Sequence, residues 1–133
     1  MQIAVIGCGG IAALRHIPAI QKLDCAEITA YYDLYYERAK EYASRYGGKA
    51  YEDYGELLRH SEIDAVIVCT AARSHCDMTI KALEAGKHVL CEKPMAVSAE
   101  DAVAMNCAAQ KSGKTLMISH NQRRYEPHIK ARE

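Results

Sequence analysis

The chain begins MQIAVIGCGGIA (residues 1–12), and this short stretch carries the strongest evidence about its architecture. The run Ile3–Ile6 is continuously apolar, which is typical of a strand buried on both faces of a parallel sheet. Glycines end the strand, and a helix-like stretch follows over residues 11–23, in which Pro18 predicts a break or a restart. This order of strand, glycine turn and helix predicts the opening of a βαβ unit.

Apolar runs and helix-like stretches continue to alternate along the chain. Further strands are expected at 27–32, 49–51, 64–69, 87–91 and 115–119, and further helices at 35–46, 53–59, 75–85 and 98–111. In the helix at 35–46, the residues expected to share one face are Tyr35, Ala39, Tyr42, Ala43 and Tyr46. The alternation predicts an α/β fold with a doubly wound parallel sheet, a Rossmann fold, of strand order 3-2-1-4-5-6.

Composition narrows the class of protein. Lys plus Arg and Asp plus Glu both number 17 in 133 residues, so the formal net charge is zero and nothing favours a nucleic acid partner. The chain has no apolar run of the ~20 residues that a membrane span requires and no signal-peptide pattern. We therefore expect a cytoplasmic protein with no membrane partner. The oligomeric state stays open, a homo-oligomer included.

Six cysteines lie at positions 8, 25, 69, 76, 91 and 107, with no Cys-x-x-Cys pair. We expect no metal site and no disulfide framework, and we interpret the cysteines as small buried apolar residues. Cys8, Cys69 and Cys91 follow or end neighbouring strands, so their thiols should crowd one edge of the sheet. An alternative hypothesis gives Cys8 a lowered pKa and a sensitivity to oxidation, because it precedes a helix N-terminus.

The glycine turn has the pattern G-x-G-x-x-A of dinucleotide-binding proteins. Its candidate cofactor-binding residues are Gly7, Gly9, Gly10, Ile11 and Ala12. Gly7 permits the tight turn, Gly9 lets backbone approach a pyrophosphate, and Ala12 keeps the helix close to the strand. The helix N-terminus then offers its amides to the phosphates. A structural glycine turn in another α/β fold and a methyltransferase-like fold that binds S-adenosylmethionine remain alternatives.

Asp33 ends the second expected strand, where an acidic side chain accepts hydrogen bonds from the adenosine ribose. A carboxylate at this place repels a 2′-phosphate, and positions 34–36 hold no Arg or Lys. The sequence therefore favours NAD over NADP as the cofactor. Arg38 is the main reservation, because a nearby guanidinium can accommodate the 2′-phosphate.

Further candidates follow the later strands. In an open parallel sheet, ligands lie outside the carboxyl ends of the strands, so the loop from Thr70 to His75 should face the cofactor. His75 either contacts the nicotinamide half or is an ordinary first residue of a helix. Lys93 can hydrogen-bond a substrate hydroxyl or polarise a carbonyl, and Glu92 can orient it or contact the cofactor ribose. We expect a cis Lys93–Pro94 bond, because the loop must turn sharply.

Together these motifs resemble the N-terminal half of the Gfo/Idh/MocA oxidoreductases. The glycine turn, Asp33, the block AGKHVLCEKP (residues 85–94) and the pattern from Asn121 to Pro127 occur in the right order and spacing. The resemblance implies that Gly7, Gly9 and Asp33 bind NAD(P). It also implies that Lys93 contacts substrate and nicotinamide ribose, as the catalytic residue. The residues that would line the cofactor cleft are Thr70, His75, Glu92 and Asn121.

Members of that family act mostly on sugars, inositols and related polyols and run to more than twice this length. We therefore expect residues 1–120 to be the dinucleotide-binding domain and residues 121–133 to begin the connection to a C-terminal substrate domain that this chain lacks. No residue here matches the proton-accepting histidine of that domain, so the chain alone should bind NAD without turnover. The alternative is a stand-alone NAD-binding sensor or a module that docks to a partner.

Overall fold

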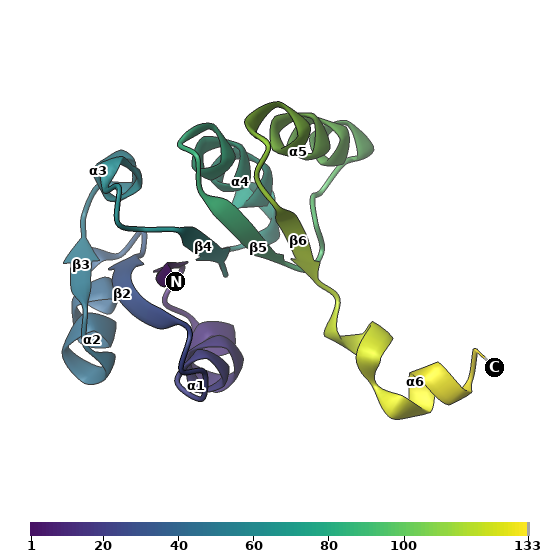
Figure 1. The fold of residues 1–133 in the computed structure, drawn as a ribbon, viewed down its shortest axis with the longest axis horizontal. Helices are drawn as coiled ribbons and strands as arrows, with labels where there is room; N and C mark the ends of the chain where they lie inside the picture. The colour runs from purple at the N-terminus through teal and green to yellow at the C-terminus, as the bar shows by residue number, and fades with distance from the viewer. Residues whose placement is uncertain (133) are drawn as a thin grey trace.

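The computed structural model describes residues 1–132 apart from the side chain of Arg124. Its centre is a six-stranded sheet in which every neighbouring pair is parallel, with the order β3-β2-β1-β4-β5-β6 (Figure 1). The strands are β1 (Gln2–Ile6), β2 (Glu27–Tyr32), β3 (Lys49–Tyr51), β4 (Ala65–Val68), β5 (His88–Glu92) and β6 (Leu116–Ser119). Both the α/β class and the doubly wound strand order expected from the sequence are confirmed.

Helices cover the two faces of the sheet (Figure 1). One face carries α1 (Ile17–Ile20) and α2 (Tyr36–Tyr46), and the other carries α3 (Tyr54–Arg59), α4 (His75–Glu84) and α5 (Ala99–Ser112). The short helical turns are η1 (Ala12–His16), η2 (Ala72–Ser74) and η3 (Asn121–Arg124). After β6 the chain leaves the sheet through η3 and α6 (Glu126–Lys130), which project away from it. Within residues 1–132, no helix has both the length and the apolar character needed to cross a bilayer.

The strands alternate between two separate cores. Along β1, Ala4 and Ile6 pack on the side of α3, α4 and α5, whereas Ile3 and Val5 pack on the side of α1 and α2. All four side chains are buried, as a strand at the centre of a parallel sheet requires. The continuous apolar run in the sequence therefore reflects burial on both faces.

Two local details differ from the expectations. Tyr35 precedes α2 and is 62% exposed, while Tyr36 packs on the core in its place, so the expected helical face was wrong at this residue. The helix after the glycine turn is interrupted earlier than Pro18 suggested, because residues 12–16 form a π-helical turn before α1 begins. A proline has no N–H for an i→i−4 bond, so the wider turn lies just ahead of it.

Gly7, directly after β1, lies against the backbone of the residues directly after β4. Its φ is +94°, and a Cβ there would lie 2.8 Å from the Cys69 carbonyl carbon and 2.9 Å from the Thr70 nitrogen. The Cys69 N–H also donates to the Ile6 carbonyl at 2.7 Å. Both the backbone conformation and the lack of space therefore demand glycine.

We predict that Gly7→Ala lowers the free energy of unfolding by at least about 2 kcal/mol, because it adds backbone strain to a clash with main-chain atoms. Urea denaturation measures the loss. Gly10→Ala is the matched control, since a Cβ at Gly10 meets nothing within 4 Å and φ there is not positive. Equal stability of the two variants would contradict this account of the turn.

Candidate functional site

The glycine turn and Asp33 form one hydrogen-bonded unit at the carboxyl edge of the sheet. The Cys8 N–H donates to Asp33 Oδ2 at 2.8 Å, and the Tyr35 N–H donates to Asp33 Oδ1 at 2.8 Å. The carboxylate is buried, with 8% of the residue exposed. Because an ionised carboxylate has about four acceptor positions, Asp33 can still accept from a ligand while it holds the turn in place.

Open space lies over the rest of the turn. A Cβ at Gly9 or Gly10 would meet no protein atom within 4 Å, so the packing of residues 1–132 does not require glycine at either position. The Tyr42 hydroxyl of α2 donates to the Gly9 carbonyl at 3.0 Å and so ties the glycine turn to α2. Ile11 and Ala12 instead pack on the core beneath the helix, and Ala12 is fully buried, so it sets the helix close to the sheet.

His75 joins the loops that follow β4 and β5. Its Nδ1 lies 2.8 Å from the Pro94 carbonyl oxygen and its Nε2 lies 2.9 Å from the Thr70 carbonyl oxygen. The residue is 1% exposed, so the structure places it between the two loops rather than on their surface. The Lys93–Pro94 bond is cis, as the sequence suggested.

Glu92 is held on both of its carboxylate oxygens. Oε1 lies 2.8 Å from His16 Nε2, and Oε2 accepts from the Lys93 N–H at 3.1 Å. Burial alone would raise the pKa of Glu92. Hydrogen bonds from His16, from the Lys93 N–H and from Ser119 outweigh that effect and keep this pKa below its usual value. The Lys93 side chain is exposed, and within residues 1–132 no acceptor binds its ammonium group.

Asn121 begins η3 and lines a pocket of about 490 Å³ beside the last two strands. The same pocket includes His16 and Ser119, the residues that contact Glu92. The structure therefore brings Asn121 into the neighbourhood of the Glu92–Pro94 loop. Within residues 1–132, no group of three or more His, Cys, Asp or Glu side chains is arranged to hold a metal ion.

His16 and Tyr42 are site residues that the sequence analysis missed. A signal for His16 was present, because positions 12 and 16 of a helix share a face and Ala12 was already expected to face the sheet. Tyr42 was expected only to fill the core. Its contact with Gly9 spans 33 positions in the sequence and depends on how α2 is seated on the sheet.

Only three of the six cysteines are buried packing residues. All six are free, and Cys8, Cys69 and Cys91 are buried, whereas Cys25 and Cys107 are exposed and depart from the expectation. Burial, reinforced by the Asp33 carboxylate, raises the pKa of Cys8 to about 12, so the alternative of a lowered pKa is wrong. Burial also raises the pKa of Cys69 to about 12. Cys91 packs on the opposite face of the sheet from Cys8 and Cys69, but both Cys8 and Cys91 lie near enough to Cys69 to contribute to its raised pKa, as expected for thiols at one edge of the sheet.

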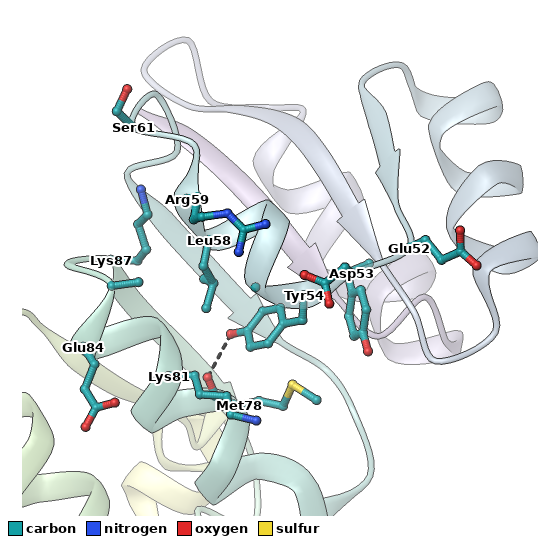
Figure 2. Close-up of a pocket in the computed structure, with 13 residues that line it drawn as sticks. Glu52, Asp53, Tyr54, Leu58, Arg59, Ser61, Met78, Lys81, Glu84 and Lys87 are labelled. Atoms are coloured by element: carbon teal, nitrogen blue, oxygen red, sulfur yellow. Dashed lines mark hydrogen bonds between the residues drawn. The ribbon is translucent and has the colours of Figure 1, made fainter.

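A larger cavity is separate from these residues. It has a volume of about 870 Å³ and lies between α3 and α4, where the Tyr54 hydroxyl donates to the Met78 carbonyl at 2.8 Å (Figure 2). Tyr54, Leu58 and Met78 supply apolar surface, and the charged side chains of Arg59 and Lys87 also line the cavity. None of the residues predicted for the cofactor lines it.

Comparison with known proteins identifies the family of this chain. A family model described as an oxidoreductase family with an NAD-binding Rossmann fold matches residues 1–120. The chain belongs to the Gfo/Idh/MocA oxidoreductase family. Among Gfo/Idh/MocA relatives, dTDP-3,4-didehydro-2,6-dideoxy-alpha-D-glucose 3-reductase of Actinomadura kijaniata is 38% identical over 117 residues, or 88% of this chain. Myo-inositol 2-dehydrogenase of Thermotoga maritima is 34% identical over 92% of this chain.

Solved structures of related proteins have the same fold as this chain. A 3-ketoreductase from Actinomadura kijaniata, in complex with NADP and TDP-benzene, superposes with a TM-score of 0.91 at 34% identity and covers 98% of this chain. An NAD-binding protein from Listeria innocua has a TM-score of 0.85 at 35% identity and covers 92%. The chain spans 35% and 37% of the two curated relatives named above and 40% and 36% of these two structures.

The lowered pKa of Glu92 predicts a pH dependence of stability. A carboxylate whose folded pKa lies below its unfolded value of about 4.3 stabilises the fold above that pH, and the contribution disappears as pH falls through the folded pKa. The difference in unfolding free energy between the wild type and Glu92→Gln should therefore shrink between about pH 5 and pH 3. Glu84→Gln, an exposed change on α4, should show a constant difference. A Glu92→Gln difference that is also independent of pH would contradict the hydrogen-bonded carboxylate.

Proposed function

We propose that this chain is the NAD-binding domain of an oxidoreductase that acts on a secondary alcohol of a sugar, inositol or related polyol. The observation that carries the proposal is the glycine turn of residues 7–10 at the end of β1, which we call the cradle. Within it, the protein's own packing requires glycine at position 7 but not at position 9. A glycine that faces open space leaves room for a bound group to approach the backbone. Residues 121–133 then begin the connection to the substrate domain.

The residues around the cradle fit a nicotinamide dinucleotide. Gly9 and Gly10 present the start of a helix to the pyrophosphate, and Asp33 has acceptor positions left for ribose hydroxyls. Thr70 borders the turn directly, since its nitrogen lies 2.9 Å from a Cβ built on Gly7. When bound, the nicotinamide ring supplies or accepts the hydride.

Lys93 is the group that we assign to the substrate. Glu92 is engaged by His16 and by the Lys93 N–H, so it does not neutralise the Lys93 ammonium. A free ammonium can donate a hydrogen bond to the substrate oxygen and stabilise negative charge there. This exposed lysine favours an enzyme domain over a stand-alone sensor, because a sensor has no need of a group beside the substrate. Residues 1–133 alone should bind cofactor without turnover, since they span about two-fifths or less of the relatives.

Asp33 underlies our proposal that NAD is preferred to NADP, although the Actinomadura kijaniata 3-ketoreductase structure contains NADP. Two backbone N–H groups fix the carboxylate at the end of β2, where it would repel a 2′-phosphate. The Arg38 guanidinium lies 4.7 Å from the centre of the Tyr35 ring and is engaged there. Leu34, the residue after Asp33, is 81% exposed and offers no positive charge to a 2′-phosphate.

The cradle is tested with Gly9→Val. The added side chain should weaken NADH binding at least tenfold, because it fills the space that we assign to the cofactor, while the unfolding free energy changes by less than about 1 kcal/mol. Fluorescence titration with NADH and urea denaturation give the two numbers. Unchanged affinity in a folded variant, or no NADH binding by the wild type, would overturn the proposed function.

Cofactor choice is tested by titrating NADH and NADPH in parallel. The wild type should bind NADH at least tenfold more tightly, a difference of about 1.4 kcal/mol or more. Asp33→Ser combined with Leu34→Arg should narrow or reverse this ratio, because it removes the repelling carboxylate and adds a cation. Equal affinities in the wild type would show that Asp33 does not select the cofactor.

A further inference from the structure

Lys93 lies between two residues that are each held by a histidine. Glu92, on one side, contacts His16 Nε2 through its carboxylate at 2.8 Å. Pro94, on the other side, contacts His75 Nδ1 through its carbonyl oxygen at 2.8 Å. Within residues 1–132, neither histidine forms a hydrogen bond with Lys93, so any effect on the lysine is transmitted through its neighbours.

The two histidines lie in the segments that follow β1 and β4 at the carboxyl edge of the sheet. His16 ends the π-helical turn η1, which starts directly after the glycine turn that follows β1. His75 opens α4 after the loop that follows β4, and its second ring nitrogen lies 2.9 Å from the Thr70 carbonyl in that loop. β1 and β4 are adjacent in the sheet, so the two loops emerge side by side.

Both contacts are shielded from water. His75 is 1% exposed, and the side chains of His16 and Glu92 are 12% and 10% exposed. Carbonyl oxygens only accept and a neutral imidazole carries one N–H, so a neutral His75 donates to one of the two carbonyls and only a doubly protonated ring donates to both. Buried hydrogen bonds of this kind are costly to leave unmade, which makes the geometry of the Glu92–Pro94 loop specific.

We propose that His16 and His75 are positioning residues that hold Lys93 at the crevice and link its placement to the two cofactor-facing loops. The proposal rests on the proposed function, in which Lys93 meets the substrate beside the nicotinamide. His16 acts through the Glu92 carboxylate, whose other oxygen accepts from the Lys93 N–H at 3.1 Å. His75 acts through the Pro94 carbonyl and joins it to Thr70.

Replacing a histidine by Asn or Gln distinguishes a hydrogen-bonding role from a role in packing alone. The amide nitrogen of Asn stands at the place of a histidine Nδ1, and that of Gln at the place of Nε2. His75→Asn therefore keeps the bond to Pro94 and loses the bond to Thr70, whereas His75→Gln does the reverse. Gln is closer to His in volume, so a purely structural role predicts that Gln is the better substitute. Positioning of Lys93 through Pro94 predicts that Asn is better.

The readout is the environment of Lys93 in the 133-residue chain. Lysines are dimethylated with ¹³C, which keeps their charge, and the Lys93 signal is assigned with Lys93→Arg. In the wild type, saturating NAD should shift the Lys93 methyl resonance. His75→Gln and His16→Leu should lose at least half of that shift, whereas His75→Asn and His16→Gln, which keeps the Nε2 donor, should retain most of it. His60→Gln is the control, because His60 contacts Glu62 and Tyr51 instead.

The outcomes separate the two proposals. A wild type that binds no NAD overturns the proposed function and this inference with it. A wild type that binds NAD while the Lys93 resonance does not move, or moves equally in all histidine variants, overturns the inference alone. So does a result in which His75→Gln preserves the shift better than His75→Asn.

One measurement needs no variant and so does not depend on their folding. In the unmodified chain, NMR should detect a slowly exchanging N–H proton on His75 Nδ1, because this nitrogen is buried and lies 2.8 Å from the Pro94 carbonyl oxygen. A His75 ring without an N–H on Nδ1 would mean that His75 does not donate to Pro94. The positioning of Pro94 by His75 would then be overturned.

Discussion

The approach of Gly7 to the backbone of Cys69 and Thr70 is the constraint on which the rest of the structure depends. A Cβ at Gly7 would lie 2.8 Å from main-chain atoms, so the first strand can end there only as glycine. This contact sets β1 against β4 and makes them the central pair of the sheet. It also turns the chain sharply, so the following helix starts at the carboxyl edge. The close packing of the Gly7 backbone therefore helps to position the edge of the sheet that we assign to the cofactor.

Apart from the contact between His16 and Glu92, the surrounding residues hold this edge by hydrogen bonds between side chains and backbone groups. Asp33 accepts from the Cys8 N–H, the Tyr42 hydroxyl donates to the Gly9 carbonyl, and His75 contacts the Pro94 carbonyl. Each of these bonds joins segments that are far apart in the sequence. Polar side chains that bind buried backbone groups rigidify a site, because breaking any one leaves an unsatisfied group. The surface ion pairs of this chain, such as Lys81 with Asp77, are exposed and add little.

The sequence was most informative where local patterning and backbone geometry coincide. The alternation of apolar runs and helical stretches predicted the strands and their order, and the glycine turn with Asp33 indicated the edge that we assign to the cofactor. At Tyr35 and Tyr36, adjacent tyrosines made the helical register ambiguous, and only packing selects Tyr36. The contact of His16 with Glu92 joins residues 76 positions apart and could not follow from spacing. Likewise, Cys8 is buried and Cys25 is exposed. The sequence could not predict this difference, because both are cysteines without a local partner.

The central claim is that the carboxyl edge of the sheet, and not the larger cavity between α3 and α4, receives a nicotinamide dinucleotide. Hydrogen exchange followed by mass spectrometry, with and without saturating NADH, tests this claim most directly. The account predicts new protection in peptides that contain residues 7–12, 33–35, 69–75 and 92–95, and none in peptides from 54–61 and 78–87. Protection concentrated in the peptides from α3 and α4, with the glycine turn unchanged, would contradict it.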